Sequence, residues 1–248
     1  MTDFYKLQDM ILWYLSYTQT HNTENIWVGL QTSDALFCAQ DRVRNQAFFE
    51  ALKQVIRDDT IVVDAWSGTG ILGYFALALG AHEVHLIESN PQSLELSRGL
   101  AEYLGYSERC HFHLADAREI RLDTNYDILI SETLTSGFSG EDFPEIIQNL
   151  KWDTTLIIPQ AFEFIIKEYD TSHRLLTSQS VSLESRTLPS HYPLKLHPDT
   201  ESLEIYSEVT LYWDIKIKSG DCSSFMNMRT VRVSDGHGFF RFEKTIAL

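Results

Sequence analysis

Cysteine is rare in this chain of 248 residues, which has only Cys38, Cys110 and Cys222. No two of them lie close together in the sequence, so neither a disulfide framework nor a cysteine-paired zinc site is predicted, and a reducing, cytoplasmic compartment is favoured. Glycine and proline are also scarce, with 12 and 6 residues, whereas 44% of the residues are hydrophobic. This composition excludes fibrous and disordered proteins and predicts a sizeable core.

Basic residues are the second deficit, because 35 acidic residues face 20 basic ones and the net charge is −15. General nucleic-acid binding needs basic stripes that displace phosphate counterions, and none is present, so we do not expect it. No apolar run is long enough to span a membrane. The first residues, with Asp3 and helically spaced apolar positions, do not resemble a signal peptide, so a cytoplasmic protein without membrane association is expected.

The pattern of apolar residues divides the chain into three zones. The pattern predicts helices that cover the following domain in residues 1–56 and short strands alternating with helices in residues 57–160. It predicts a β-rich extension in residues 161–248. The alternation implies an α/β fold of the doubly wound, Rossmann-like class, with a mostly parallel sheet. The expected strands are Thr60–Ala65, Glu83–Glu88, Cys110–Ala115, Tyr126–Ser131 and Thr155–Ile158, and the expected helices are Ile71–Leu79, Pro91–Leu104 and Phe143–Leu150.

Apolar and polar residues alternate through the last zone, from Ile205 to Ile217. This period of two predicts one long antiparallel strand with a buried face. Its expected partners are Phe162–Tyr169, Met226–Val233 and Phe239–Thr245. The sequence stops on a short apolar run, so the interpretation that it is a domain cut from a longer chain stays open.

A glycine-rich loop follows the first expected strand of the alternating zone. Gly68, Gly70 and Gly73 spell G-x-G-x-x-G, and Glu88 closes the next strand, 20 residues after Gly68. On their own, these residues fit the dinucleotide fingerprint, in which the acid binds the ribose hydroxyls. An NAD(P)-dependent oxidoreductase is therefore one interpretation of this loop.

Two further carboxylates favour a different cofactor. Asp64, at the carboxyl end of the first strand, would repel a pyrophosphate but would favour the ammonium and sulfonium groups of S-adenosylmethionine. Asp116, after the third strand, is placed to accept a hydrogen bond from an adenine amine. Together with Glu88, these acids predict S-adenosylmethionine as the cofactor.

The chain resembles the class I methyltransferases and, among them, the protein arginine methyltransferases, over about residues 40–162. Ser67–Leu72 matches that family's S-G-T-G-I-L loop residue for residue, and Asp41–Leu52 looks like its D-x-x-R segment. The resemblance implies a seven-stranded methyltransferase sheet, an Arg44 that binds the cofactor's carboxylate and a Glu88 that binds its ribose. The full set of expected cofactor-binding residues is Arg44, Asp64, Trp66, Ser67, Gly68, Gly70, Ile71, Leu72, Glu88, Ser89, Asp116, Ala117 and Glu132.

Two glutamates are the candidate catalytic residues. Ser131-Glu132 stands where the family has S-E, and Glu141 follows nine residues later, the spacing of the family's two substrate glutamates. By resemblance, Glu132 and Glu141 would bind the cationic guanidinium of a peptide or protein and position it for in-line methyl transfer. The family pattern is altered at Trp66, which replaces a glycine, and at Thr133–Phe138, which replaces a W-M-G-Y stretch, and no T-H-W segment follows.

Other functions stay open at this point. The departures favour an O- or N-methyltransferase that acts on a small molecule or short peptide, including a carboxylate, in a tailoring pathway. An NAD(P)-dependent oxidoreductase and a non-catalytic cofactor-binding module are the alternatives from other classes, and a homodimer is one assembly to test. His111 and His113 share one side of a strand beside Cys110, but they lack a third suitably spaced ligand, so no metal site is expected.

Overall fold

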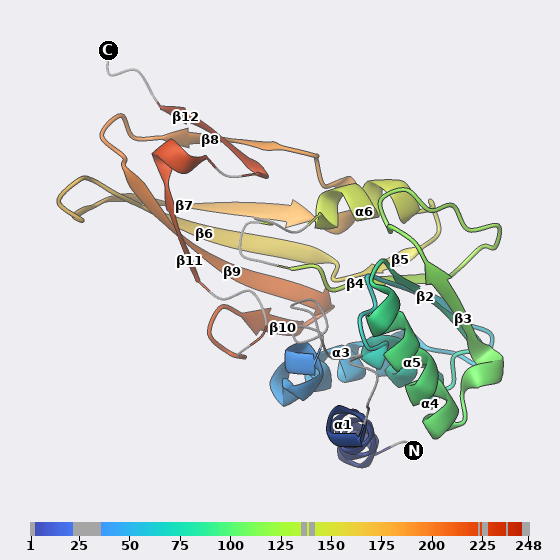
Figure 1. The fold of residues 1–248 in the computed structure, drawn as a ribbon. Helices are drawn as coiled ribbons and strands as arrows, with labels where there is room; N and C mark the ends of the chain where they lie inside the picture. Colours follow the sequence, from blue (N-terminus) through green and yellow to red (C-terminus); the bar gives the residue numbers. More distant parts are fainter. Residues whose placement is uncertain are drawn as a thin grey trace.

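The computed structural model describes residues 3–21, 36–134, 138, 142–222, 224, 228–236 and 238–244. A parallel sheet flanked by helices occupies one part of the molecule and a long antiparallel sheet the other (Figure 1). No helix within these residues has both the length and the apolar character needed to cross a bilayer.

The central sheet is parallel throughout and has the strand order β3-β2-β1-β4-β5. Its inner strands are buried on both faces, as expected where crossover helices cover a sheet. This confirms the predicted mostly parallel α/β architecture. The strands are β1 Ile61–Ala65, β2 Glu83–Glu88, β3 Cys110–Leu114, β4 Ile128–Ser131 and β5 Leu156–Ile158, and the helices between them are α4 Ile71–Leu79, α5 Pro91–Leu104 and α6 Phe143–Leu150.

The predicted count of seven strands is not confirmed, because five strands form this sheet in the described residues. After β5, none of the described segments returns to this sheet. It continues directly into β6, Ala161–Tyr169, which pairs antiparallel with β7 and β9 of the second sheet. The residues that would supply two further strands are therefore used elsewhere.

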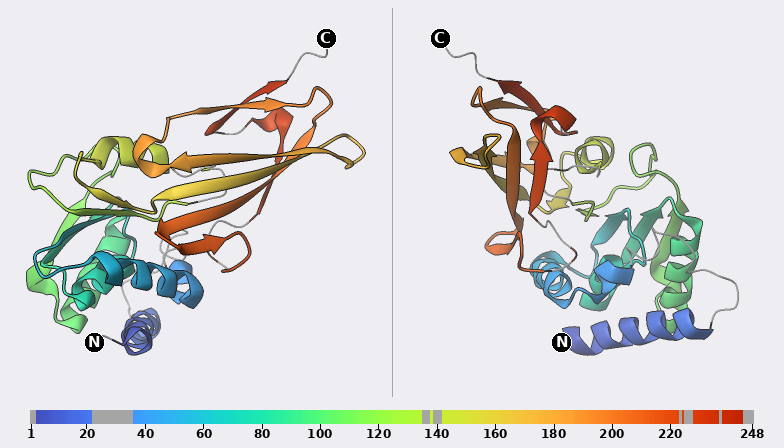
Figure 2. Two further views of the ribbon diagram at one scale, coloured as in Figure 1. Left: turned by 180° about the vertical axis from the view of Figure 1, so that it is seen from behind. Right: turned by 60° about the vertical axis from the view of Figure 1, so that its left-hand side comes forward.

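The amino-terminal helices form a layer beside the parallel sheet (Figure 2). α1, Phe4–His21, packs on α3 and α5, and α3, Arg42–Val55, packs on α4 and reaches β9 and β10. Asp41 caps α3, since its Oδ1 accepts from the Arg44 N–H at 3.1 Å, as an N-cap carboxylate should. Its Oδ2 accepts from the N–H and the hydroxyl of Ser224, both at 2.8 Å, which ties α3 to the carboxyl-terminal part of the chain.

The second sheet has the order β10-β9-β6-β7, with β11 also paired to β9, and β8 and β12 form a separate parallel pair. This confirms a β-rich carboxyl-terminal region. The predicted single strand Ile205–Ile217 is wrong, because the chain turns at Trp213 and Asp214 and returns as β10. The remaining bounds are β7 Leu175–Glu184, β8 Tyr192–Leu196, β9 Ser202–Tyr212, β10 Ile215–Lys218, β11 Arg229–Arg232 and β12 Phe240–Lys244, with short 3-10 helices at Ser107–Arg109, Ser185–Thr187 and Val233–Asp235.

An aromatic cluster joins the two sheets. Phe138, from the segment after β4, stacks on Phe143 of α6 with ring centroids 5.3 Å apart and meets Phe162 of β6 edge to face at 4.7 Å. The three rings are almost fully buried, and packed aromatic pairs of this kind contribute beyond their buried area. The cluster therefore holds the antiparallel sheet against the end of the parallel one.

Candidate functional site

The candidate site lies at the carboxyl edge of the parallel sheet. Because the strands run the same way, the segments that follow β1, β2, β3 and β4 all emerge at that edge. The strand order also reverses between β1 and β4, which is where open α/β sheets bind their ligands. The expected residues in these segments are Trp66, Ser67, Gly68, Gly70, Ser89, Asp116, Ala117 and Glu132.

The glycine loop makes a tight turn between β1 and α4. Ser67 N–H donates to the Ile87 carbonyl at 2.9 Å, and Gly70 N–H donates to the Ser67 carbonyl at 2.8 Å. Gly68 and Gly70 have φ of 55° and 79°, the left-handed region that favours glycine. A Cβ on Gly70 would stand 2.5 Å from Ser97 Oγ, so this residue is also required by the packing of α4 against α5.

Asp64 is buried beneath that loop rather than open to it. Its side chain is almost inaccessible, and its Oδ2 accepts from the Gly73 N–H at 2.9 Å, which fixes the first turn of α4 to β1. Burial raises the pKa of Asp64 to about 7, although the Gly73 N–H and Arg44 both lower it. The structure therefore adds a positioning role that the sequence did not predict.

Glu88 closes the other side of the loop. One of its carboxylate oxygens accepts from Gly68 N–H at 2.8 Å and the other from Asn90 N–H at 2.7 Å. Burial raises the pKa of this carboxyl, and the backbone N–H groups oppose the rise. Each oxygen has a second lone pair, so the group can hold the loop and still accept from a ribose hydroxyl.

Asp116 has a partner that the sequence analysis missed. The Arg118 Nε donates to both carboxylate oxygens, at 2.9 and 3.1 Å, and Arg118 Nη1 donates to Asp142 at 2.8 Å. The guanidinium also lies 5.5 Å from the centre of the Trp66 ring, within cation–π range. Two opposite charges two residues apart are common in any sequence, so no pattern pointed to Arg118.

Arg44 and Glu132, which were expected to serve the cofactor and the acceptor, are in direct contact. Arg44 Nη2 donates to Glu132 Oε2, and Arg44 Nη1 donates to the Cys38 carbonyl at 3.1 Å and to Asn45 Oδ1 at 2.6 Å. Burial lowers the pKa of Arg44, but the Glu132 carboxylate raises it and prevails, so the guanidinium stays charged. Burial raises the pKa of Glu132 against the opposing effect of Arg44.

The other expected residues differ in accessibility. Ile71, Leu72 and Ala117 are buried in the core, whereas Ser89 is exposed at the end of β2. Glu141 lies outside the described residues. Between the two predicted glutamates, Phe138 is anchored in the aromatic cluster.

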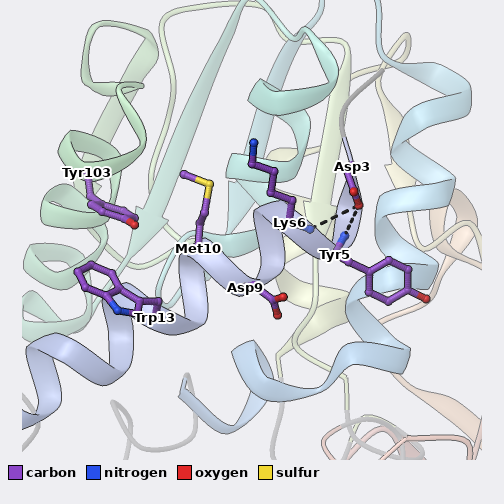
Figure 3. Close-up of a pocket in the computed structure, with 7 residues that line it drawn as sticks. All are labelled: Asp3, Tyr5, Lys6, Asp9, Met10, Trp13 and Tyr103. Atoms are coloured by element: carbon purple, nitrogen blue, oxygen red, sulfur yellow. Dashed lines mark hydrogen bonds between the residues drawn. The ribbon is translucent and has the colours of Figure 1, made fainter.

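A surface hollow on α1 is a different feature (Figure 3). It has a volume of about 670 Å³ and lies between α1 and the end of α5. None of its lining residues was expected in the site, so we do not assign it a role in catalysis. The residues that line the hollow are Asp3, Tyr5, Lys6, Asp9, Met10, Trp13 and Tyr103.

S-adenosylmethionine fits the groups gathered at the carboxyl edge. Arg44 Nε and Ser67 Oγ are buried and have no hydrogen-bond partner in the described part of the chain, so both have capacity for a polar ligand. A guanidinium suits the cofactor's carboxylate, and the spare lone pairs of Glu88 suit its ribose.

Residues 56–200 match the model of a family described as a methyltransferase domain. Three curated relatives are tRNA wybutosine-synthesizing protein 2 homolog of Homo sapiens, ribosomal protein L11 methyltransferase of Haemophilus influenzae and probable histone-arginine methyltransferase CARM1 of Oryza sativa. They are 33% identical over 97 residues, 34% over 93 and 30% over 97, respectively. Each match covers 38% of this chain, and the matches span only 20%, 30% and 18% of the respective relatives.

Solved structures show the same fold over most of the chain. A crystal structure of PRMT6 superposes with a TM-score of 0.64 at 14% identity and covers 82% of this chain and 86% of its own. The PRMT1 enzyme–prozyme heterotetrameric complex of Trypanosoma brucei with AdoHcy gives 0.61 at 14% identity, with coverage of 79% and 82%. At such low identity the likeness establishes the fold alone.

Family membership favours methyl transfer over the NAD(P)-dependent oxidoreductase and over a non-catalytic module. The fingerprint glycines are shared by both kinds of nucleotide site, whereas the family match is specific to methyltransferases. Because the matched residues 56–200 make up more than half of the 248, this chain belongs to the methyltransferase domain family: it carries an S-adenosylmethionine-dependent methyltransferase domain, with a fold like that of the protein arginine methyltransferases.

Proposed function

We propose that the chain methylates a nitrogen of a peptide or protein, with the guanidinium of arginine as the first candidate. The observation that carries this proposal is the position of Glu132. It follows β4 at the carboxyl edge of the sheet, and its Oε2 is bound to Arg44, a residue assigned to the cofactor. A carboxylate has about four lone-pair sites, so Glu132 can hold Arg44 and still accept from an acceptor N–H.

In methyl transfer the protein has to orient the acceptor relative to the methyl group of the cofactor. When bound, S-adenosylmethionine supplies the methyl group on its sulfonium. The Glu132 carboxylate would orient a guanidinium through charge-assisted hydrogen bonds and would favour the positive charge of the methylated product. A substrate carboxylate would be repelled at the same place.

The proposed cofactor site is the one predicted from the sequence, with two changes that the contacts support. Asp64 acts by fixing α4, and Asp116 acts together with Arg118 beside Trp66. Residues 57–160 would bind the cofactor, while 1–56 would cover it and 161–248 would face the acceptor. The net charge of −15 also suits a cationic acceptor.

Incubation of the full chain with isotopically labelled S-adenosylmethionine and a peptide that contains one arginine tests the proposal. We expect methylation of that arginine, located by mass spectrometry, and none when lysine replaces it in an otherwise identical peptide. Glu132→Gln should reduce turnover by about 100-fold or more, the loss seen when one charge-stabilising group is removed from an active site. Methylation of both peptides alike, or of neither, would contradict the arginine assignment.

A small-molecule acceptor is the second candidate. Two sequence features favour it, namely the replacement of the family's W-M-G-Y stretch by Thr133–Phe138 and the lack of a T-H-W segment. Under this alternative, a panel of small amines and acids would be methylated while arginine peptides are not. A carboxylate acceptor would further require that Glu132 not face it as an anion, and turnover would then survive Glu132→Gln.

Self-association is proposed separately. The Trypanosoma brucei neighbour is described as a heterotetrameric complex, which makes a homodimer of this chain worth testing. Sedimentation velocity over a range of protein concentrations would distinguish a stable dimer from a monomer.

A further inference from the structure

Three histidines and a glutamate form a cluster on β2 and β3, outside the site described above. His85 is paired with His111 in the register of these neighbouring parallel strands, which lie at the end of the sheet (Figure 1). Glu83 is two residues before His85, and His113 is two residues after His111. Side chains two residues apart in a strand share a face, so all four lie on the same side of the sheet.

That face is the one turned away from α4 and α5. The opposite face carries Leu86, which lies against Gly73 of α4, and Phe112, whose ring has Arg98 of α5 at 4.4 Å from its centre. Cys110 alternates onto this opposite face as well, so its thiol is not part of the cluster. In the sequence, His111 and His113 of β3 stand near that cysteine and have no third candidate ligand close by. In the folded chain, Glu83 and His85 of β2 lie beside them.

The ligand atoms are close enough to share one ion. Glu83 Oε2 lies 3.0 Å from His111 Nε2, and Glu83 Oε1 lies 3.5 Å from His85 Nε2. One atom from each of the three residues can be chosen so that all lie within 4.8 Å of one another. Neighbouring ligands of a four-coordinate zinc ion, with bonds of about 2.0–2.2 Å, stand roughly 3.4 Å apart, which matches these separations.

His85 gives an independent indication of a ligand. The residue is 7% exposed, its Nδ1 lies 3.0 Å from His113 Nε2, and its buried Nε2 lies 3.5 Å from Glu83 Oε1 without forming a hydrogen bond of good geometry within the described ranges. If Nδ1–H donates to His113, then Nε2 is a bare lone pair that faces a carboxylate oxygen, and a cation between the two would relieve the repulsion. Histidines that bind metals show the same division, with one nitrogen on the ion and the other donating to a neighbour.

We propose that Glu83, His85 and His111 bind a zinc ion, with water as the fourth ligand and with His113 as the residue that orients His85. Imidazole and carboxylate together suit zinc, whereas calcium and magnesium prefer oxygen ligands alone. The His111 side chain is 46% exposed, which leaves the ion a path of entry.

The proposed zinc site is separate from the methyl-transfer site. Glu83 begins β2 and Glu88 ends it, so at about 3.3 Å per residue the two sites stand roughly 16 Å apart along the strand. β3 ends the strand order of this sheet, and β2 is its neighbour there. A zinc ion that joins β2 to β3 would hold this strand in place.

Calorimetric titration of the metal-stripped full chain with zinc chloride at neutral pH tests the proposal. We expect one equivalent to bind, and we expect His111→Ala and Glu83→Gln each to weaken binding by about tenfold or more. His82→Ala is the matched control and should bind like the unaltered chain, because His82 is an exposed histidine next to Glu83 but outside the cluster.

Thermal unfolding gives a second measurement. Zinc should raise the Tm of the unaltered chain and of His82→Ala, and at the same zinc concentration it should raise the Tm of His111→Ala and of Glu83→Gln by less. Circular dichroism would check that the variants are folded. The proposal is overturned by an absence of binding at one equivalent, by equal effects of His111→Ala and His82→Ala, or by weak binding of several equivalents to surface histidines.

Discussion

Arg44 and Glu132 form a buried ion pair that joins the first turn of α3 to the carboxyl end of β4. The two residues are 88 positions apart, and their side chains are 3% and 11% exposed. The sequence assigns Arg44 to the cofactor, and it assigns Glu132 to both the cofactor and the acceptor. Their contact means that the two binding functions share one charged unit, so a change at either residue affects both.

We expect Glu132→Leu to lower the free energy of unfolding by about 3–5 kcal/mol, because it leaves a buried guanidinium unpaired. Urea denaturation measures this loss. Arg42→Ala is the matched control, since it removes an exposed pair with Asp9 and should cost at most about 1 kcal/mol. The double variant Glu132→Leu/Arg44→Met should recover much of the lost free energy of unfolding. Equal losses for Glu132→Leu and Arg42→Ala would contradict a buried ion pair.

Asp64 should make the fold less stable as the pH rises. Its pKa is about 7 in the folded chain, raised by burial, and near 3.9 in an unfolded chain. The unfolded state therefore loses this proton first, and the contribution of Asp64 to stability, full below about pH 4, is lost as the pH rises to about 7.

Denaturation of Asp64→Asn between those pH values measures the effect, because the amide cannot ionise and still accepts from Gly73 N–H. The variant's stability should fall less steeply with pH, by up to about 1 kcal/mol per pH unit. Asp58→Asn, a change in the exposed turn before β1, is the control and should follow the unaltered chain. Parallel curves for Asp64→Asn and the unaltered chain would refute the prediction.

Trp66 occupies a left-handed backbone position, with φ of 62°, where the related family has glycine. A side chain in that region costs about 1–2 kcal/mol. Trp66→Gly and Trp66→Ala both lose the contact with Arg118, but glycine alone removes the backbone strain. We therefore expect the glycine variant to be the more stable of the two by about 1 kcal/mol in denaturant, and the opposite order would show that the backbone is unstrained.

Gly73→Ala should destabilise the contact between α4 and the sheet. Its Cβ would stand 2.8 Å from Leu86 Cδ2 and 2.9 Å from Val84 Cγ1, and such overpacking costs about 1–3 kcal/mol. Gly238→Ala is the control, since no atom of the described residues, apart from its chain neighbours, lies within 4 Å of its added Cβ. The Tm of the two variants compares them directly, and equal values would mean that the helix can move away without cost.

The parallel core was predictable because its signals are local. α4 and α5 end at Gly80 and Gly105 in the left-handed conformation, and both helices have the predicted bounds. The antiparallel region was harder to predict, because a two-residue turn at Trp213 and Asp214 leaves odd-numbered residues on the buried face of both β9 and β10. Alternation alone therefore could not distinguish one strand from a hairpin.

The sequence by itself determined the parallel sheet, the glycine turn and the kind of cofactor, since each depends on residues that are neighbours along the chain. Only the tertiary structure decided which charges meet. It paired Arg44 with Glu132, Arg118 with Asp142 and Glu83 with His111. Partners separated by tens of residues come together through strand order and register, which local patterns do not encode, and for the same reason the number of strands in the sheet could not be predicted from its first five.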